Sequence, residues 1–385
     1  MRFKRRPQAN RCNAQMRVLW ITNFAAPYRL PVWDQLRTSH ILTIGLLESR
    51  KSLAADPGAN RGTDWHVQEA STPAFVEIPT WKVKVGEARY YVLKSFLPLL
   101  AVGGQDVVVF GGWESPAYWL LLFAAMVLGV ARVGFYESTL TTMRHRTGPI
   151  AWIRSWFFRQ MHAVVVPGQA AREALQHIGV PRSKILEGFN AIDVEAFRQK
   201  CPTDVTSEDP SGGHRYLYVG QLIPRKRVDA IIDAFSRIAG TADELTIVGS
   251  GQLNDELTSL AKSRGTSIRF LPYIDNRLLP QLMAKHHTLV LASADEVWGM
   301  VVNEALAAGL HVVVSDNCGV VPSVAEMQGV FIASRNLRDL AARLRESRDS
   351  WGGKISTPEI LRWTPERFAD VFSDAMRRAV LAISR

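Results

Sequence analysis

The chain of 385 residues is long enough for two or three domains at roughly 100–200 residues each, which excludes a single small module. Hydrophobic residues make up 47% and charged residues 21%, a balance that is typical of folded globular domains and excludes a largely disordered chain. The net charge of +10 favours an anionic partner, such as a nucleotide phosphate, a nucleic acid or an acidic membrane face.

Residues 1–15 form the most basic segment of the chain, and five basic residues there precede the first acidic one. We expect a disordered tail, either a solvated arm or a contact with anionic lipid. Polar residues from Gln8 to Gln15 interrupt any apolar run, so a signal peptide is not predicted. Three scattered cysteines predict neither a disulfide framework nor a metal site, and they favour a cytoplasmic location.

The first half of the chain alternates short runs of Val, Ile and Leu with segments of helical period. This alternation predicts repeated β–α units on a parallel sheet, and the runs are apolar throughout, as in strands covered on both faces. The predicted strands are Arg17–Thr22, Ile41–Leu47, Asp106–Gly111, Val133–Tyr136 and Ala163–Pro167.

Two apolar segments in this half predict helices. Ala117–Ala131 is shorter than the roughly 20 residues of a membrane-spanning helix, so we predict a helix buried in the core. Gly148–Met161 mixes aromatic residues with Arg154 and Arg159 and contains no acid, a composition typical of a helix at a membrane interface. A core helix whose arginines extend to the surface explains that segment equally well.

Residues 200–213 are polar and contain several prolines and glycines, which predicts a linker. We therefore predict a first domain over 16–199, a second over 214–362, and a C-terminal helix over 363–385 that returns to the first domain. The strands predicted after the linker are Tyr216–Val219, Leu245–Val248, Ile268–Tyr273, Thr288–Leu291 and His311–Ser315, and the helices are Val228–Ala239, Asn254–Ser263 and Met300–Ala308.

Two glutamates flank a predicted helix start in the second domain. Glu296 and Glu304 are eight residues apart, and Gly299 lies between them. Free N–H groups and the positive end of the helix dipole at Gly299, Met300 and Val301 favour an anion such as a diphosphate. The carboxylates would then serve sugar hydroxyls. Alternatively, Glu296 is a capping acid and Glu304 an exposed helix residue.

A loop rich in cations follows the first strand of the second domain. The chain turns at Gly220 and Gln221 and continues through Arg225 to Lys226. Lys226 is placed to reach a phosphate, although a solvated basic loop explains the same pattern. The next strand ends in a G-x-G pattern at Gly249–Gly251, where the backbone could approach a ligand closely or simply turn.

Strand order, motifs and spacing together resemble the nucleotide-sugar-binding half of a retaining GT-B glycosyltransferase of family 4. The resemblance covers most of Met16–Phe331. The matching motifs are Y-V-G-x-L-x-P-x-K at Tyr218–Lys226, I-V-G-x-G at Ile247–Gly251, E-x-x-G-x-x-x-x-E at Glu296–Glu304 and A-x-x-x-G at Ala305–Gly309.

The resemblance implies an α/β fold of two Rossmann-like domains facing across a cleft, and a hexosyltransferase that needs no metal or other cofactor. Lys226 would hold the donor diphosphate, Glu304 the ribose hydroxyls, and Glu296 the transferred sugar as a catalytic residue. Tyr273 would lie against the base. The remaining implied donor-binding residues are Gly220, Gln221, Arg225, Gly249, Gly251, Trp298, Gly299, Met300 and Val301.

The chain departs from the family pattern at three positions near this site. Gln221 stands where the family usually carries an arginine, and Pro272 and Ala292 replace a usual glycine and a usual proline. A neutral amide loses a charge-assisted hydrogen bond worth roughly 1.5–3 kcal/mol. Arg225 is the candidate substitute for the missing cation.

The resemblance assigns the acceptor to the first domain. Glu137 lies where many relatives carry a histidine, so it is the acceptor-side catalytic candidate, with helix capping as the alternative. Asn23, Tyr28, Arg29 and Ser138 are candidate acceptor-binding residues. The expected acceptor is a glycan or a lipid-linked molecule of cell-surface polysaccharide or glycolipid assembly, and the expected location is cytoplasmic, peripheral on the inner face of the cell membrane.

Two other functions fit parts of the sequence. A nucleotide-sugar epimerase shares the expected fold, but the glutamate pair favours transfer. A basic nucleic-acid-binding protein would spread its cations over one face, whereas Arg225 and Lys226 cluster near the paired glutamates. We therefore expect a nucleotide sugar, and not a nucleic acid, as the anionic partner.

Overall fold

The computed structural model describes residues 15–48, 74–86, 88–199 and 212–384. These residues form two compact units, one ending at Phe189 and completed by the segment that begins at Pro365, and the other extending over Asn190–Thr364. Residues 190–199, which the sequence analysis assigned to the first domain, belong to the second unit. The predicted tail 1–15 and linker 200–213 lie almost wholly outside the described residues.

A seven-stranded parallel sheet lies at the centre of the first unit, in the order β3-β2-β1-β6-β7-β8-β9. The five strands predicted in this half are confirmed with shifts at their ends, and β3 and β9 were not predicted. The strands are β1 (Arg17–Thr22), β2 (Ile41–Leu46), β3 (Ala74–Glu77), β6 (Val107–Phe110), β7 (Ala131–Phe135), β8 (Ala163–Val166) and β9 (Ile185–Glu187).

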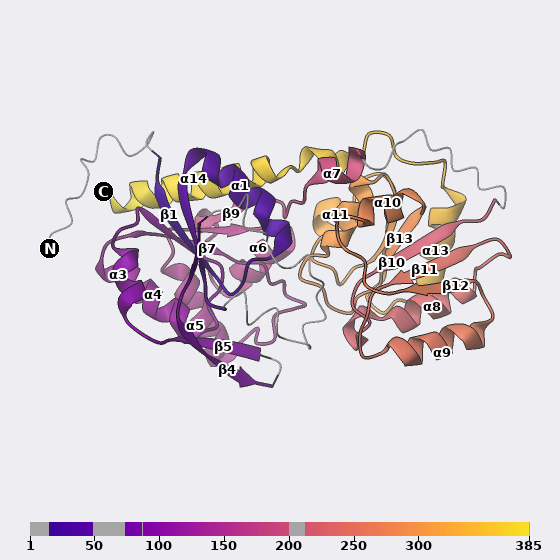
Figure 1. The fold of residues 1–385 in the computed structure, drawn as a ribbon, viewed down its shortest axis with the longest axis horizontal. Helices are drawn as coiled ribbons and strands as arrows, with labels where there is room; N and C mark the ends of the chain where they lie inside the picture. Colours follow the sequence, from indigo (N-terminus) through magenta and orange to yellow (C-terminus); the bar gives the residue numbers. More distant parts are fainter. Residues whose placement is uncertain (1–14, 49–73, 87, 200–211, 385) are drawn as a thin grey trace. The chain divides into compact units, whose positions relative to one another are not determined.

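Helices cover both faces of this sheet (Figure 1). On one face, Trp20 of β1 and Phe135 of β7 pack against Phe372 of the C-terminal helix. That face is covered by α1 (Leu30–Ser39) and α14 (Pro365–Ile383). The other is covered by α3 (Leu97–Val102), α4 (Pro116–Val127), α5 (Gly148–Arg159), α6 (Gln169–His177) and the antiparallel hairpin of β4 (Thr80–Val85) and β5 (Ala88–Leu93).

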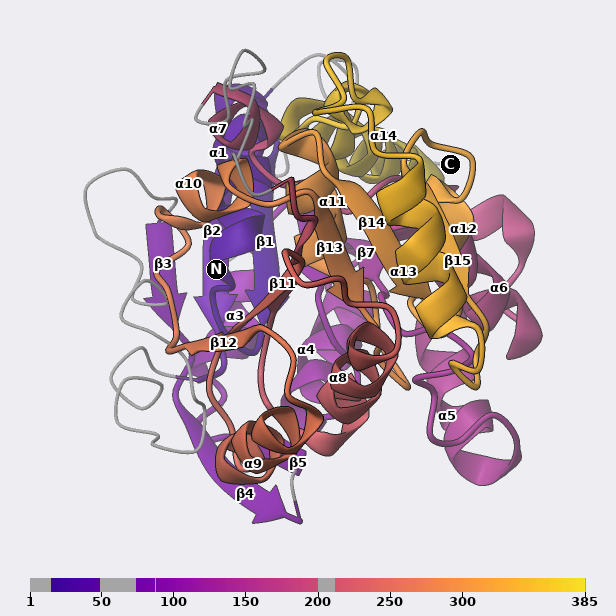
Figure 2. The same ribbon diagram turned by 90° about the vertical axis from the view of Figure 1, so that its right-hand side faces the viewer.

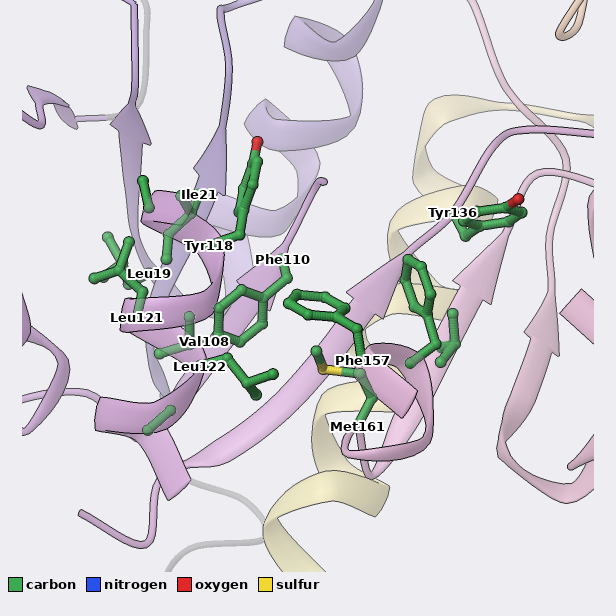
Figure 3. Packing of buried hydrophobic residues seen from close by; sticks show 14 of the residues in the cluster. Leu19, Ile21, Val108, Phe110, Tyr118, Leu121, Leu122, Tyr136, Phe157 and Met161 are labelled. Carbon is green, nitrogen blue, oxygen red and sulfur yellow. The ribbon is translucent and has the colours of Figure 1, made fainter. Parts of the chain in front are cut away.

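The core beneath α4 and α5 is built from apolar and aromatic side chains of the sheet and these two helices (Figure 3). Phe110 of β6 meets Phe157 of α5 edge-on at 5.9 Å between ring centroids. However, α4 ends at Val127 and its outer side is exposed, with Phe123 46% and Val127 86% exposed. The helix predicted over Ala117–Ala131 therefore forms and packs into the core on its inner side, but it is not buried on its outer side. No helix among the described residues is long and apolar enough to cross a membrane.

The second unit contains a six-stranded parallel sheet, in the order β12-β11-β10-β13-β14-β15. All elements predicted after the linker are confirmed within a few residues, and β15 was not predicted. The strands are β10 (Arg215–Val219), β11 (Glu244–Val248), β12 (Ile268–Leu271), β13 (Thr288–Leu291), β14 (His311–Ser315) and β15 (Val330–Ala333).

Helices α8, α9 and α13 cover one face of this second sheet, and α10 and α11 cover the other (Figure 2). The apolar stripe of α8 is buried, since Val228, Ile231 and Ile232 are almost fully inaccessible. The helices are α7 (Val194–Gln199), α8 (Val228–Ser236), α9 (Asn254–Arg264), α10 (Leu279–Ala284), α11 (Met300–Ala307), α12 (Val321–Val324) and α13 (Leu340–Asp349).

The same arginine–histidine pair occurs at the amino end of both sheets. In the first unit, the backbone N–H of Arg132 donates to His162 Nδ1 at 3.1 Å, and its guanidinium lies 3.2 Å from Nε2. Arg215 and His287 repeat this arrangement in the second unit at 3.2 and 3.0 Å. Burial and neighbouring cations lower the pKa of His162 to about 4, so this ring is neutral and structural at pH 7.

Candidate functional site

The carboxyl ends of the parallel strands in the second unit meet at one edge of the sheet, where α/β folds commonly bind ligands. Loops that follow β10, β11, β12 and β13 begin at this edge, and α11 begins there as well. They carry the predicted donor residues Gly220, Gln221, Arg225, Lys226, Gly249, Gly251, Tyr273, Glu296, Trp298, Gly299, Met300, Val301 and Glu304.

Gly249 and Gly251 hold the loop after β11 against the loop after β10. A β-carbon at Gly249 would lie 1.9 Å from the carbonyl oxygen of Gly220, and one at Gly251 would lie 2.3 Å from that of Leu222. The backbone of Gly249 also has a φ of +144°, which other residues rarely adopt. The packing of the two loops therefore requires both glycines, independently of any ligand.

We expect Gly249→Ala to destabilise the protein by more than about 2 kcal/mol, because the methyl group would collide with a backbone oxygen and strain the φ angle. Urea unfolding measures the change. Gly352→Ala is the matched control, since nothing lies within 4 Å of its added β-carbon. Equal stability of the two variants would contradict the tight packing of these loops.

Lys226 and Glu296 form an ion pair at this edge of the second sheet. Both side chains are largely buried, with 12% and 15% of their surface exposed. The same carboxylate oxygen, Oε2, lies 3.5 Å from Arg225 Nη1 and accepts a hydrogen bond from Ser293 Oγ at 3.3 Å. The sequence analysis gave Lys226 and Glu296 separate tasks, whereas the structure places them in direct contact.

The backbone fixes this pair from two directions. The N–H of Ala294 donates to the carbonyl oxygen of Arg225 at 2.7 Å, which ties the Glu296 loop to the cation-rich loop. The carbonyl oxygen of Glu296 accepts from the N–H of Gly319 at 2.9 Å, and Glu296 forms a parallel β-bridge with Cys318. The carboxylate is therefore held in one place before a ligand binds, as catalysis by preorganised groups requires.

Helix α11 begins directly after this loop. Gly299 precedes it with a φ of +103°, and the first N–H groups of a helix lack acceptors within the helix. Glu304, one turn further along, is partly buried, and burial raises its pKa to about 7. No cation among the described residues pairs with its carboxyl group. This group can therefore exchange a proton and form hydrogen bonds to hydroxyls near neutral pH.

Trp298 lies inside the second unit and is only 4% exposed. Its indole N–H donates to Asn303 Oδ1 at 3.3 Å, and the Asn303 amide donates to the carbonyl oxygen of Asn190 at 2.6 Å. Trp298, which was predicted to bind the sugar donor, therefore lies beneath the start of α11 and supports it. Tyr273, by contrast, is 37% exposed after β12.

Gln221 contributes its backbone to the shape of the cation-rich loop. Its carbonyl oxygen accepts from the hydroxyl of buried Tyr218 at 2.9 Å. Burial holds the pKa of Tyr218 well above its usual value, so the hydroxyl remains a donor. Among the described residues, no cluster of three or more His, Cys, Asp or Glu side chains is placed to hold a metal ion.

In the first unit, the predicted acceptor residues lie at the carboxyl edge of the other sheet. Arg29 pairs with Glu137, the residue after β7 and Tyr136, and its guanidinium lies 5.0 Å from the ring of Phe135 and 5.7 Å from that of Tyr28. Burial alone would lower the pKa of Arg29, but the Glu137 carboxylate together with the hydroxyls of Tyr28 and Tyr118 outweighs burial, and the pKa is raised. Ser138 follows Glu137 in the chain and is partly buried.

Asn23 belongs to the same edge, where its side-chain oxygen accepts from the hydroxyl of Tyr118 at 2.8 Å. Its carbonyl oxygen accepts from the N–H of Glu48 at 2.8 Å. Glu48 is almost fully buried and bonds to Lys82, to Arg89 at 3.4 Å and to the Tyr91 hydroxyl at 2.6 Å. The sequence analysis missed this network.

The missed network depends on the β4–β5 hairpin. Apolar and charged residues alternate over Trp81–Val85, Gly86 follows with a φ of +59°, and a second run rich in Tyr and Val completes the pattern. Such alternation around a glycine is a hairpin signal, and it was available in the sequence. The hairpin brings two cations to the edge that also carries the Arg29–Glu137 pair.

Comparison with known proteins decides the family. A family model described as Glycosyl transferases group 1 matches residues 205–351. Over 307 residues the chain is 30% identical to an uncharacterized glycosyltransferase of Methanocaldococcus jannaschii, covering 75% of this chain and 76% of that protein. This chain belongs to the group 1 glycosyl transferases.

The fold of this glycosyltransferase matches solved GT-B structures, as the sequence predicted. HepE of Anabaena in complex with UDP gives a TM-score of 0.66 at 14% identity, covering 96% of this chain and 97% of HepE. WaaB, a lipopolysaccharide outer core galactosyltransferase, gives a TM-score of 0.67 at 14% identity, covering 94% and 99% of the two chains. Since both identities are low, these two likenesses establish the fold alone.

Proposed function

We propose that this glycosyltransferase moves a hexose from a nucleoside diphosphate sugar to an acceptor with retention of the anomeric configuration and without a metal ion. The observation that carries the proposal is the Lys226–Glu296 pair, fixed beside the start of α11 and followed by Glu304, whose carboxyl group pairs with no cation of the described residues. The family assignment favours transfer over nucleic-acid binding.

The electrostatics of this edge suit a diphosphate. Arg225 and Lys226 place two positive charges beside the largely buried Glu296 and the half-exposed Asp295, and the raised pKa of Glu304 reduces the negative charge nearby. The N–H groups at the start of α11 add a positive dipole end. We propose that Lys226 donates a hydrogen bond to the diphosphate, which makes Glu296 available to the sugar. That HepE was solved with UDP is in keeping with such a donor.

The carboxyl groups are suited to the neutral parts of the donor. Glu296 is fixed by its backbone, by hydrogen bonds from Lys226 and Ser293 and by the nearby Arg225, so it can accept a hydrogen bond from a sugar hydroxyl as charge develops at the anomeric carbon. Glu304 can receive the ribose hydroxyls without a competing cation. In the front-face retaining transfer that we propose, an oxygen of the departing phosphate takes the acceptor proton, so no protein base is required.

We propose that the acceptor binds at the edge with Asn23, Tyr28, Arg29, Glu137 and Ser138. The partly buried Arg29–Glu137 pair offers both a donor and an acceptor of hydrogen bonds, which suits a hydroxylated molecule. A glycan or lipid-linked acceptor of cell-surface assembly, used at the inner face of the membrane, is the substrate class that we propose. WaaB, which acts on the lipopolysaccharide outer core by its description, has the same fold.

Screening nucleotide sugars for slow hydrolysis without an acceptor tests the donor assignment. Release of a nucleoside diphosphate and free sugar supports transfer, whereas return of an altered nucleotide sugar would support epimerisation. Hydrolysis is expected to continue in EDTA. Activity that disappears in EDTA and returns with magnesium or manganese would contradict metal independence. The anomeric configuration of the first product, read by NMR, tests retention.

We expect Lys226→Ala to weaken binding of a nucleoside diphosphate about tenfold to a hundredfold, because a charge-assisted hydrogen bond is lost. The diphosphate would also face a Glu296 carboxylate without its main partner. Nucleoside binding should change little. Calorimetry with both ligands measures the difference, and Lys262→Ala, an exposed lysine on α9, is the control. Equal weakening for both ligands would indicate a structural lysine.

A further inference from the structure

Several large apolar side chains of the first unit are exposed to solvent. They lie on neighbouring elements of the layer formed by α3, α4, α5 and the β4–β5 hairpin. Helix α4 packs against both α3 and β5, and Trp119 of α4 stacks on Trp156 of α5 at 5.7 Å. Figure 1 shows these elements on the same side of the sheet. We call the following exposed residues the apolar face: Trp81, Val83, Val85, Phe96, Leu97, Leu100, Leu120, Phe123, Val127, Ile150, Trp152 and Ile153.

Helix α4 shows most clearly that this exposure is not incidental. Its twelve residues contain no charged or amide side chain, although the helix lies at the surface. Leu120, Phe123 and Val127 follow the i, i+3, i+7 spacing of one stripe, and they are 37%, 46% and 86% exposed. A surface helix in water normally carries polar residues on this stripe, so its apolar composition points to a binding surface.

The neighbouring helices extend the same surface. Leu97 and Leu100 of α3 are 72% and 71% exposed, and Trp152 of α5 is 68% exposed. Monomeric proteins rarely expose contiguous apolar surface of this kind without a partner. On its inner side α5 is a core helix, with Phe157 and Phe158 fully buried. Of the two interpretations of its sequence, the core helix therefore describes the inner side and the interfacial helix suits the outer side.

The charge around the apolar face is mainly positive, and the exposed acid Glu114 precedes α4. Exposed Arg144 and Arg146 immediately precede α5, exposed Arg159 ends it, and exposed Lys94 precedes α3. Helices α3, α4 and α5 contain no aspartate or glutamate. Arg154 is not part of this rim, because it is buried and lies 4.7 Å from the centre of the Trp113 ring.

We propose that the apolar face inserts into the interfacial region of an anionic lipid membrane. Leu, Phe and Val side chains would enter the acyl boundary, Trp81 and Trp152 would lie among the headgroups, and the basic rim would meet anionic phosphates. This charge complementarity favours a lipid surface over a second protein. The apolar face is then the surface by which the enzyme reaches a membrane acceptor, and this assignment rests on the proposed function.

The test measures flotation of the full chain with vesicles of phosphatidylcholine and phosphatidylglycerol. The parent is expected to bind. The triple variant Leu97→Ser, Leu100→Ser, Val127→Ser is expected to bind at least about tenfold more weakly, because three apolar side chains no longer leave water. A control variant, Ile41→Ser with Leu381→Ser, changes two exposed apolar residues outside the apolar face and should bind like the parent.

Two further variants separate the apolar and electrostatic contributions. Trp152→Ser alone, on a different helix, is expected to weaken binding about fivefold. Arg144→Ala with Arg146→Ala is expected to weaken binding about tenfold at low salt, and the deficit should shrink as salt rises. Since neither variant touches the triple site, each keeps the inference testable if the triple variant misfolds.

Donor hydrolysis in solution is measured on the same samples, and it should be unchanged in every variant. A parent protein that hydrolyses the donor but does not bind the vesicles would overturn the membrane inference and leave the proposed function intact. Equal vesicle binding by the parent and the triple variant would also overturn it. Sedimentation tests the other occupant: a concentration-dependent dimer that the triple variant abolishes would assign the apolar face to a second copy of the chain instead.

Discussion

Glu296→Gln is expected to lower the rate of transfer about a hundredfold or more, a loss of roughly 3 kcal/mol of transition-state stabilisation. The amide keeps the shape and most hydrogen bonds of the side chain but removes the negative charge beside the transferred sugar. Binding of a nucleoside diphosphate should be unchanged or tighter. In the parent, the Glu296 carboxylate pairs with Lys226 and so competes with phosphate, and the variant lacks this carboxylate.

Steady-state kinetics and calorimetry on the same preparation check both parts of this prediction. Asp295→Asn is the matched control, because Asp295 is the neighbouring acid, half exposed and 4.0 Å from Arg225. That variant should transfer at nearly the parental rate. A rate for Glu296→Gln within tenfold of the parent, or a marked loss of diphosphate binding, would contradict the role proposed for this carboxylate.

Acidification is expected to destabilise the second unit through buried histidines at the amino end of its sheet. His214, His286 and His311 are 5%, 2% and 6% exposed. Burial lowers the pKa of His214 to about 3 and that of His286 to about 4, and it also lowers the pKa of His311. Because the unfolded chain binds protons more readily, stability is complete above about pH 6.5 and falls as the pH drops toward 4.

The groups around His214 do not cancel this effect. His287, His311 and Arg348 add positive charge, and Asp243 alone opposes them. Each buried histidine is expected to cost on the order of 1 kcal/mol at about pH 5. The raised pKa of Glu304 has the opposite sign, since it favours the folded state as its carboxyl takes up a proton, so the effect of one substitution is a cleaner test than the whole curve.

His286→Gln provides that test. Urea midpoints at about pH 7.5 and about pH 5 should differ less for this variant than for the parent, by on the order of 1 kcal/mol in the free energy of unfolding. His177→Gln, an exposed histidine on α6, should leave the difference unchanged. A parental pH dependence in His286→Gln would show that His286 is not held neutral by the fold.

Periodicity predicted the strands and helices of the second unit well because its β–α units are short and regular. Val228 to Phe235 show the cause: their helical stripe matches the buried face of α8. The β4–β5 hairpin and the edge strands β3 and β9 were missed, because β4 alternates apolar with charged residues and β3 and β9 are short strands that each contain an acid. The edge strand β15 was missed although its four residues are all apolar.

The candidate site shows a similar limit. Motif spacing brought Lys226 and Glu296 to the same sheet edge, but their ion pair depends on the loop contacts of Ala294 and Gly319. The buried place of Trp298 follows from Asn303, which matches no motif element that we used. The exposed side of α4 could not be foreseen from hydrophobicity, because an apolar sequence does not say what covers it.

The path of the chain determines the order in which its two units can be completed during synthesis. The first unit needs α14, which covers Trp20 and Phe135, yet this helix lies beyond the whole of Asn190–Thr364 in the sequence. The second unit is therefore complete while the first still lacks the helix that, with α1, covers one face of its sheet. Until α14 leaves the ribosome, the nascent chain carries exposed aromatic surface, and chaperones have their longest opportunity to bind the half that was made first.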